Sequence, residues 1–585
     1  MRSHLMRIRK ACLGILILFG AVCEFGHAAI EPDFLMDSVP DLRVPDPVAN
    51  FNPSLKRLWL AALDRPEIDM QRMAAETIAR AHPYGVPGLE EAVPRLEQIL
   101  IAESSHPAAR FASARALIVL KSESSSEKLL KASQSFGSDL RLLIEPVLAE
   151  WKSPVAIDIW KQRLQVSSVH PRELLLAIRG VGQLREATML PTLIQMAQNR
   201  LLNADIRLEA ATAAGQIAES GLEPDCNQLL SNTSGVGTFE RLCVVRLLAR
   251  HRGDAVQALL ISLASDAEPA VAAAALGRLN EIDPDLVLPL AETAIRNPDP
   301  AVRGQAAYAY LQRPSVERIQ VLGELLGDPH PAVRRRVSEG FLQFKDLPEL
   351  NDAVLSGATK VLNADRWQGH EQAALLFGAL EYRPPAKRLV ELLDSPRPEV
   401  MIATAWALRK LSVEETVPGM IDVAFRQSVK RREKTVPGVD DQVAHLFEAL
   451  GQLRAKSATK LLEAYVPKKF ELGERSRSAA VEALGWIYEN EAPQSLSDSL
   501  LDRINDVASQ TPELALVRQM CTISLGRMKS VNQAAGIREF VAVEVPATKV
   551  GLAMRWAIKE LTGEELPPPK PTFIPEGNWF LVPKP

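Results

Sequence analysis

The hydrophobic positions between residues 54 and 562 recur with helical spacing, in units that restart after about thirty residues. Three clear copies are PAVAAAALGRL, PAVRGQAAYAYL and PAVRRRVSEGFL, which begin at Pro269, Pro300 and Pro331, at intervals of 31 residues. In the third copy Val333, Val337 and Phe341 stand at i, i+4 and i+8, the spacing of one face of an α-helix. The pattern predicts a series of amphipathic helices, because the alternation typical of strands is almost absent.

Each copy of the pattern predicts a pair of helices. A proline in the first turn is tolerated, because its missing N–H would have no intrahelical partner. A second apolar pattern follows in SVERIQVLGELLGD, residues 315–328, with Ile319, Leu322 and Leu326 on one side. The many alanines let helices approach closely, and a pair buries its apolar face only by stacking on the next pair. We therefore predict an all-α fold, an α-solenoid of roughly fourteen or fifteen antiparallel helix pairs.

The repeated pattern PxVRxxAAxAL, with its period near 31 residues, resembles HEAT repeats, and in particular the short variety first associated with phycobilisome lyases. The resemblance covers most of the chain between residues 54 and 562 and implies an ARM-type superhelix. Members of this family mostly supply scaffolds and docking surfaces, and a few are enzymes. The resemblance therefore implies protein binding more than catalysis, and no residue supports a bilin-lyase role beyond the resemblance itself.

Two residue types recur at fixed places in the repeat. The histidines that share the position of Asp299, directly before a helix-starting proline, are His106, His170 and His330. We interpret them as caps of their own helices. The arginines that share one position inside the helix are Arg110, Arg303 and Arg334. We interpret these as donors of hydrogen bonds between repeats.

The first 28 residues have the three-part pattern of a secretory signal peptide. MRSHLMRIRK carries four basic side chains, ACLGILILFGAV is an apolar run of twelve residues, and GHA at 26–28 has small residues at both ends. The apolar run is too short to span a bilayer comfortably. We expect cleavage after Ala28 and export to the periplasm or the extracellular space. Residues 29–53, with five prolines and no helical period, are predicted to form an extended leader.

The C-terminal residues 563–585 are also rich in proline, and they carry the aromatic side chains Phe573, Trp579 and Phe580. A terminal repeat exposes an apolar face that needs a cover. We predict that these aromatic side chains fold back over the last helix pair as a cap. The alternative is a docking peptide for another envelope protein.

Charge and cysteine content restrict the function further. The formal net charge of −4 gives no reason to expect nucleic-acid binding. Removal of residues 1–28 would leave Cys226, Cys243 and Cys521, which are too few for a disulfide framework in a chain of this length. A Cys226–Cys243 bridge would require the two side chains to lie at similar heights on adjacent helices. We interpret all three cysteines as small buried hydrophobic residues.

The segment RQSVKRREKTVPGVDD, residues 426–441, is the strongest binding candidate in the sequence. The distance between units lengthens to about forty residues here, which predicts a break in the repeat. Its basic side chains, with two that follow one unit later, are Arg426, Lys430, Arg431, Arg432, Lys434, Lys468 and Lys469. Such a patch predicts docking to an acidic protein, an anionic lipid or a glycan. The alternative is a solvated helix end with Asp440 and Asp441 as local partners.

The sequence supports no catalytic residue, cofactor or metal site. GxSxG, a Gly-rich phosphate loop, HExxH and CxxCH are absent. His370-Glu371 resembles the iron-binding pairs of deoxyhypusine hydroxylases, but that chemistry needs about four such pairs and the chain has one. We interpret His370 and Glu371 as a solvated helix start, and we do not expect an enzyme of the lyase or hydroxylase type.

These patterns together predict an exported, non-enzymatic HEAT-repeat scaffold that binds one or more unidentified proteins in the cell envelope. One alternative is an accessory module or subunit of an envelope redox or lyase enzyme. Another is a binder of anionic glycan or lipid through the basic segment at 426–434.

Overall fold

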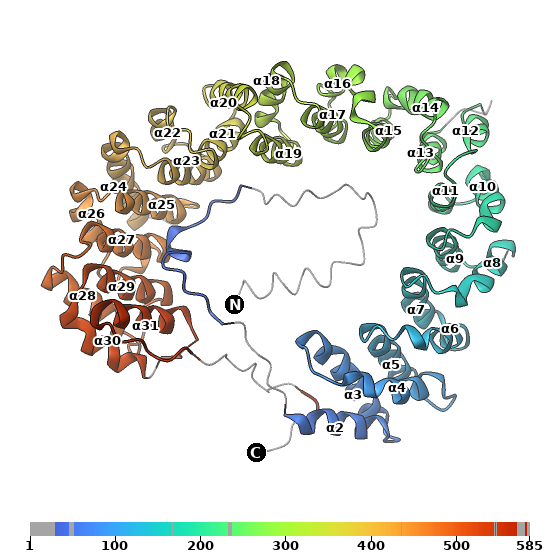
Figure 1. The fold of residues 1–585 in the computed structure, drawn as a ribbon, viewed down its shortest axis with the longest axis horizontal. Helices are drawn as coiled ribbons and strands as arrows, with labels where there is room; N and C mark the ends of the chain where they lie inside the picture. The colour runs from blue at the N-terminus through green and yellow to red at the C-terminus, as the bar shows by residue number, and fades with distance from the viewer. Residues whose placement is uncertain are drawn as a thin grey trace.

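The protein is an α-solenoid that curves into a nearly closed ring in the computed structural model (Figure 1). The structure describes residues 30–45, 52–166, 168–231, 237–433, 436–542, 544–545, 547–569 and 579–581. No strand occurs within these ranges. The predicted all-α class is therefore confirmed.

The described helices form two concentric layers, and each layer contains fifteen α-helices within the ranges above. The inner, concave layer consists of α3 (Ile68–Ala81), α5 (Pro107–Val119), α7 (Ser138–Glu150), α9 (Pro171–Gln183), α11 (Ala204–Ile217), α13 (Thr238–Leu247), α15 (Pro269–Ile282), α17 (Pro300–Gln312), α19 (Pro331–Leu342), α21 (Trp367–Ala379), α23 (Pro398–Leu411), α25 (Val439–Gln452), α27 (Glu474–Ile487), α29 (Ala515–Met528) and α31 (Lys549–Thr562).

The outer, convex layer consists of α2 (Pro53–Leu63), α4 (Val93–Ile101), α6 (Ser126–Ser135), α8 (Ile157–Gln165), α10 (Leu190–Gln198), α12 (Glu223–Leu230), α14 (Asp254–Ala264), α16 (Leu288–Ala294), α18 (Val316–Glu324), α20 (Pro348–Leu362), α22 (Ala386–Leu392), α24 (Val417–Glu433), α26 (Thr459–Glu463), α28 (Gln494–Asn505) and α30 (Ala534–Val541). Each outer helix and the inner helix after it form one pair, in agreement with the predicted number of pairs.

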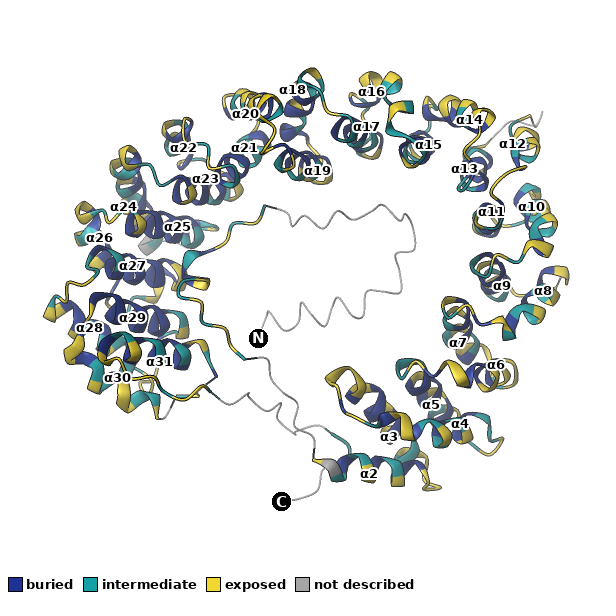
Figure 2. Ribbon diagram, viewed as in Figure 1, coloured by how far each residue is buried: buried dark blue, intermediate teal, exposed yellow. Residues whose placement is uncertain are grey.

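The core lies between the two layers, where buried residues face one another along the whole ring (Figure 2). Val333, Val337 and Phe341 of α19 are at most 2% exposed, as the hydrophobic spacing predicts. The histidine caps are confirmed, because Nδ1 of His330 accepts a hydrogen bond of 3.3 Å from the Ala332 N–H. Nδ1 of His106 and of His170 accepts the equivalent bond.

The repeated arginines connect the helices to the loops between units. Arg303 donates to both carboxylate oxygens of Asp328, at 2.7 and 2.8 Å, and Asp328 lies in the loop before the next inner helix. Arg334 donates to the main-chain oxygen of the same Asp328 at 2.8 Å. Arg110 likewise donates to the main-chain oxygen of Leu100 at 3.1 Å. The bonds of Arg334 and Arg110 satisfy carbonyl groups at or after the ends of the outer helices that would otherwise stay unpaired.

Close contact between inner helices depends on glycine at Gly215 in α11. A methyl group at this position would lie 2.1 Å from the Arg246 carbonyl oxygen of α13, which is backbone and cannot rotate away. We expect Gly215→Ala to lower the free energy of unfolding by about 1–3 kcal/mol. The matched control is Gly277→Ala in α15, where the nearest atom is a Gln305 side-chain nitrogen at 3.5 Å. Thermal unfolding should show a lower Tm for the first variant only, and equal Tm values would contradict the expectation.

The C-terminal tail reaches the first helix pair, at the opposite end of the solenoid from α31. Phe580 O accepts a hydrogen bond of 2.6 Å from Nε1 of Trp59 in α2. The Trp579 ring lies 5.9 Å from the Trp59 ring and 5.8 Å from Tyr84, between centroids. The expected cap over the last helix pair is thus wrong for residues 579–581, because the apolar face of α2 receives them. Phe573 lies outside the described residues.

The cysteines and the helix lengths agree with the remaining expectations for the fold. Cys226, Cys243 and Cys521 are buried and free, so the structure holds no Cys226–Cys243 bridge. Among the described helices, none combines the length and the apolar character needed to cross a membrane. The predicted signal peptide at residues 1–28 lies outside the described residues.

Candidate binding groove on the concave face

Residues 30–45, called the leader below, lie on the concave face and cross the inner helices from α23 to α31 (Figure 1). The leader is extended at Phe34 and contains one short 3-10 turn, Leu35–Asp37. Its partners are separated from it by more than 370 residues, for example 373 residues between Asp33 and Trp406. The leader therefore occupies the concave face as a separate extended peptide would.

The first anchor of the leader is the carboxylate of Asp33. Its Oδ1 accepts hydrogen bonds of 2.7 Å from Nε1 of Trp406 and of 2.7 Å from the Arg409 guanidinium. Arg409 also donates to the main-chain oxygen of Asp33 at 2.7 Å. Burial acts to raise the pKa of Asp33, but the Trp406 bond and the Arg409 charge outweigh it and leave this pKa below its ordinary value. Asp33 is therefore held as an anion.

The second anchor is the ring of Phe34, which is only 7% exposed. The ring stacks on the imidazole of His445 in α25, with centroids 4.1 Å apart and planes inclined by 7°. The Arg475 guanidinium of α27 lies over the ring at 4.3 Å. Burial lowers the pKa of His445 to about 3, so its ring is neutral at physiological pH. The site therefore encloses an aromatic ring between a neutral imidazole and a cation.

The leader is also held through its main chain. The Met36 N–H donates to Oε1 of Glu448 in α25 at 3.0 Å, and the Met36 side chain is 2% exposed. Val39 O accepts a bond of 3.1 Å from the Arg527 guanidinium in α29. Lys549 of α31 lies 3.7 Å from the Asp37 carboxylate. These contacts, from three inner helices, fix the register of the leader.

Two carboxylates are buried in the inner layer beneath the leader. Burial raises the pKa of Glu448 to about 7, although the Arg409 charge opposes the shift. Burial also raises the pKa of Glu482 to about 7 against the charge of Arg527, which lies 3.4 Å away, and the negative charge of Glu448 adds to the rise. The two groups therefore gain and lose protons near neutral pH.

Replacing Glu482 by Gln is expected to flatten the loss of stability between about pH 5 and pH 8. Because the folded pKa of Glu482 is raised from 4.5 to about 7, the folded protein keeps a proton that the unfolded chain loses. The stability due to this proton is complete below pH 4.5 and is lost as pH rises through 7. At about 1.4 kcal/mol per pKa unit, the wild type should lose about 1–3 kcal/mol over this window.

Thermal unfolding of both proteins across that window tests this expectation. The variant should gain Tm relative to the wild type as pH rises, even where loss of the Arg527 pair lowers its Tm at every pH. A difference in Tm that does not change with pH would show that Glu482 does not titrate in this range.

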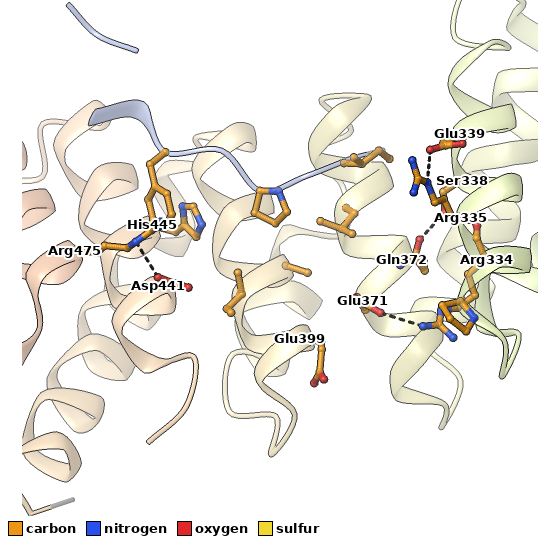
Figure 3. Close-up of a pocket in the computed structure, with 17 residues that line it drawn as sticks. Arg334, Arg335, Ser338, Glu339, Glu371, Gln372, Glu399, Asp441, His445 and Arg475 are labelled. Carbon is orange, nitrogen blue, oxygen red and sulfur yellow. Dashed lines mark hydrogen bonds and ion pairs between the residues drawn. The ribbon is translucent and has the colours of Figure 1, made fainter. Parts of the chain in front are cut away.

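A pocket of about 520 Å³ opens beside the leader between α19, α21, α23, α25 and α27 (Figure 3). Ile30, Pro32 and Phe34 of the leader form one wall. The helices contribute Pro331, Arg334, Arg335, Ser338, Glu339, Glu371, Gln372, Leu375, Glu399, Ile402, Ala403, Asp441, His445 and Arg475. The pocket therefore continues the groove that holds the leader, and it presents both signs of charge.

Glu371 lies on the floor of this pocket rather than in solvent. Its Oε2 lies 3.8 Å from the Arg334 guanidinium, and its side chain is 20% exposed. Burial raises the pKa of Glu371 above its ordinary value. The interpretation of Glu371 as part of a solvated helix start is thus wrong, because α19 and its arginine cover the first turn of α21.

Polar side chains on the pocket wall pair with one another. Ser338 donates to Gln372 at 2.7 Å and Arg335 to Glu339 at 2.7 Å, so these polar side chains already pair with neighbours on the pocket wall. Within the described ranges, no group of three or more histidine, cysteine or acidic side chains is arranged to hold a metal ion. The groove holds the leader through aromatic, charged and main-chain contacts.

The basic side chains predicted at 426–441 lie at the end of the outer helix α24 and pair with nearby acids. Arg426 donates to both oxygens of Asp394, at 2.7 and 2.8 Å, and Arg431 donates to Asp440 at 2.9 Å. Lys468 pairs with Asp506, whereas Lys430 is exposed.

Lys469, the last described member of this basic set, is partly buried beside η11, the short 3-10 helix Phe470–Leu472. The side chain of Arg432 and the whole of Lys434 lie outside the described residues. Docking through this segment stays a prediction, and its local pairs reduce the positive charge that it can offer.

The groove residues were not predicted from the sequence, although one signal for them exists. The helix VDDQVAHLFEALGQ, residues 439–452, carries His445 and Glu448 at i and i+3 on a face that is completely or almost completely buried. Polar side chains on a buried helix face need partners. Glu448 pairs with the Met36 N–H of the leader and with Arg409 of α23, and His445 stacks on the Phe34 ring.

Comparisons with known proteins agree with this fold. A family model described as HEAT repeats matches residues 256–343. The structure of yeast importin-beta, Kap95p, is similar with a TM-score of 0.50 and 12% identity, over 87% of this chain and 72% of that one. A Kap95p structure concerned with its binding to RanGDP gives 0.50 and 13%, with the same coverage. The chain therefore has a HEAT/ARM-type α-solenoid fold, and these identities show the fold alone.

A third similar structure is the complex of CpcE and CpcF of phycocyanin lyase from Nostoc sp. PCC7120. Its TM-score is 0.28 at 16% identity, over 42% of this chain and 94% of that one, which is too low to support an inference. No curated protein matches the sequence.

Proposed function

We propose that this protein is an exported, non-enzymatic scaffold that binds an extended segment of a partner protein on the concave face of its solenoid. The observation that carries the proposal is the leader itself. The inner helices hold its residues 33–39 through the Asp33 carboxylate, one aromatic ring and three main-chain groups. The HEAT-type fold supports a role in protein interaction.

The proposed binding site consists of the groove and the pocket beside it. The pocket of about 520 Å³ lies on the concave side, where five inner helices contribute side chains to one surface. Such a surface can form many polar contacts with a partner without disturbing the apolar core between the layers. The apolar patches on Ile402 and Leu375 would supply the dehydrated centre of the contact.

The proposed place of action is the cell envelope, and residues 1–28 support it. Their basic, apolar and small-residue pattern is typical of a signal peptide. We expect the protein from a fractionated cell to occur in the periplasm or the medium, with Ala29 as its first residue. N-terminal sequencing of the purified protein measures this directly. A cytoplasmic product that retains Met1 would contradict export.

Site-specific photo-cross-linking in intact cells tests the binding proposal. A photoreactive amino acid at Ile402 lies in the concave pocket, and the same group at Ile261 in the outer helix α14 is the matched control. We expect one protein, identified by mass spectrometry, to cross-link reproducibly from Ile402 and not from Ile261. Equal cross-linking from both positions, or cross-linking from Ile261 alone, would contradict binding on the concave face.

A further inference from the structure

The leader is held by features that any peptide with the same short sequence would present. Asp33 supplies a carboxylate, Phe34 an aromatic ring, Met36 an N–H group and Val39 a carbonyl oxygen. Two of these four contacts use main-chain atoms, which every polypeptide has. The groove therefore holds an extended chain in which an aspartate is followed directly by an aromatic residue.

The spacing of the helix residues makes this recognition specific. Trp406 and Arg409 lie on α23 and both donate hydrogen bonds of 2.7 Å to the Asp33 carboxylate. One donor is neutral and the other is charged, so together they favour a carboxylate at this position. His445 and Arg475 enclose the ring from two sides. Glu448 then accepts the N–H of the residue two positions after the aromatic one, which fixes the register. A peptide shifted by one residue would leave buried charges without partners.

The leader rests on polar side chains as well as on the apolar core, in which Phe34 and Met36 take part. The side chains that form hydrogen bonds or ring contacts with it are Trp406, Arg409, His445, Glu448, Arg475 and Arg527. On the leader itself, Phe34 and Met36 are the hydrophobic side chains that become buried in the described range 30–45. Releasing a leader that buries two hydrophobic side chains exposes less apolar area, and so costs less free energy, than releasing a strand that buries a continuous apolar face.

The pocket next to the leader offers contacts that the described part of the leader does not use. Oε2 of Glu371 and Nε of Arg334 are buried and make no hydrogen bond within the described part of the chain. They line the same pocket as Ile30 and Pro32, which precede the Asp33 anchor in the leader. A partner segment that continues into the pocket would reach these groups, and this would favour it over the leader.

We infer that the partner binds through an extended segment with an aspartate–aromatic pair, and that the leader is a built-in competitor for the same groove. This rests on the proposed protein-binding function and adds to it the chemistry of the partner and the control of its access. A tethered segment competes at an effective concentration in the millimolar range. A partner segment must therefore bind the groove more tightly than the leader does, and it can do so only through additional contacts.

Fluorescence anisotropy with a labelled peptide tests the inference on the full chain. The probe is IEPDFLMDSVPDL, the sequence of residues 30–42, and the proteins are the wild type and Phe34→Ala. We expect the probe to bind the variant at least about tenfold more tightly than the wild type, because the intramolecular competitor has lost its aromatic anchor. A probe with alanine in place of the phenylalanine should bind neither protein.

The matched control is Arg43→Ala in the leader. Arg43 is 89% exposed and, within the described residues, forms an ion pair only with Asp41, so this variant should bind the probe as weakly as the wild type. Hydrogen exchange at residues 33–39 reports whether the leader has left the groove. If Phe34→Ala alone leaves it protected, the double variant Asp33→Ala/Phe34→Ala replaces it in the assay.

Three results would overturn the inference. The first is equal affinity of the probe for wild type and variant. The second is no binding to a variant whose leader is shown by hydrogen exchange to be undocked. The third is a wild-type dimer in which leaders are exchanged between copies, which light scattering would show. The proposed function is tested separately, because cross-linking from Ile402 can succeed when the peptide fails, and in that case only the partner chemistry is wrong.

Discussion

Replacing Arg477 by Met is expected to lower the free energy of unfolding by about 3–5 kcal/mol. Arg477 in α27 donates to both oxygens of Glu513, at 2.8 and 2.6 Å, and both side chains are 0% exposed. Without the guanidinium, the Glu513 carboxylate would remain buried, with Arg503 at 3.9 Å and the Leu514 N–H, which donates to Oε1 at 2.9 Å, as its remaining partners. Removing one partner of a buried pair costs far more than the pair itself contributes, because the remaining charge has lost both water and its counter-charge.

Two further variants separate this explanation from a general loss of packing. The double variant Arg477→Met/Glu513→Gln removes the uncompensated charge and should recover a large part of the loss. Arg454→Met is the control on the surface, where Arg454 pairs with Glu489 and is 60% exposed, and should change stability by less than about 0.5 kcal/mol. Thermal and urea unfolding measure all four proteins. A double variant no more stable than Arg477→Met would mean that the lost packing of Arg477 explains the effect.

The solenoid was predictable from the sequence because its stability depends on a local pattern. Every unit must place apolar side chains on the same helix face to stack on its neighbours, so Val333, Val337 and Phe341 repeat the places of residues one unit earlier. The caps and the repeated arginines obey the same rule, because each satisfies main-chain groups at a fixed place in the unit. Side chains that every repeat requires therefore recur in the sequence at the period of the repeat.

The groove was not predictable in this way, because its contacts occur once. Asp33 binds Trp406 and Arg409, which are more than 370 residues away in the sequence. The Met36 N–H that binds Glu448 is a main-chain group, so no residue type in the sequence indicates this contact. Glu371 was misread for a related reason. A residue near a helix start is normally solvated, and only the neighbouring helix with Arg334 buries it here.

Replacing Trp59 by Ala is expected to destabilise the first helix pair by about 3–5 kcal/mol and to release the C-terminal tail. Trp59 is fully buried, its Nε1 binds Phe580 O at 2.6 Å, and its ring faces Trp579. Trp59→Phe removes the donor but keeps most of the ring, so it should cost only about 1 kcal/mol and keep the tail docked. Hydrogen exchange at residues 53–63 and 579–581 measures both effects.

The comparison that decides the role of the tail is with Trp160→Ala in the middle of the solenoid. Trp160 is equally buried in α8 but touches no described residue of the tail, so its loss should destabilise the helices around it and leave residues 579–581 protected. In a solenoid each pair contacts only its neighbours, so the first and last pairs normally fray independently. Because the tail connects α31 to α2, loss of Trp59 should also widen the ring, seen as a larger radius of gyration in solution scattering. An unchanged radius would mean that the repeats alone set the curvature, and that the tail only covers the apolar face of α2.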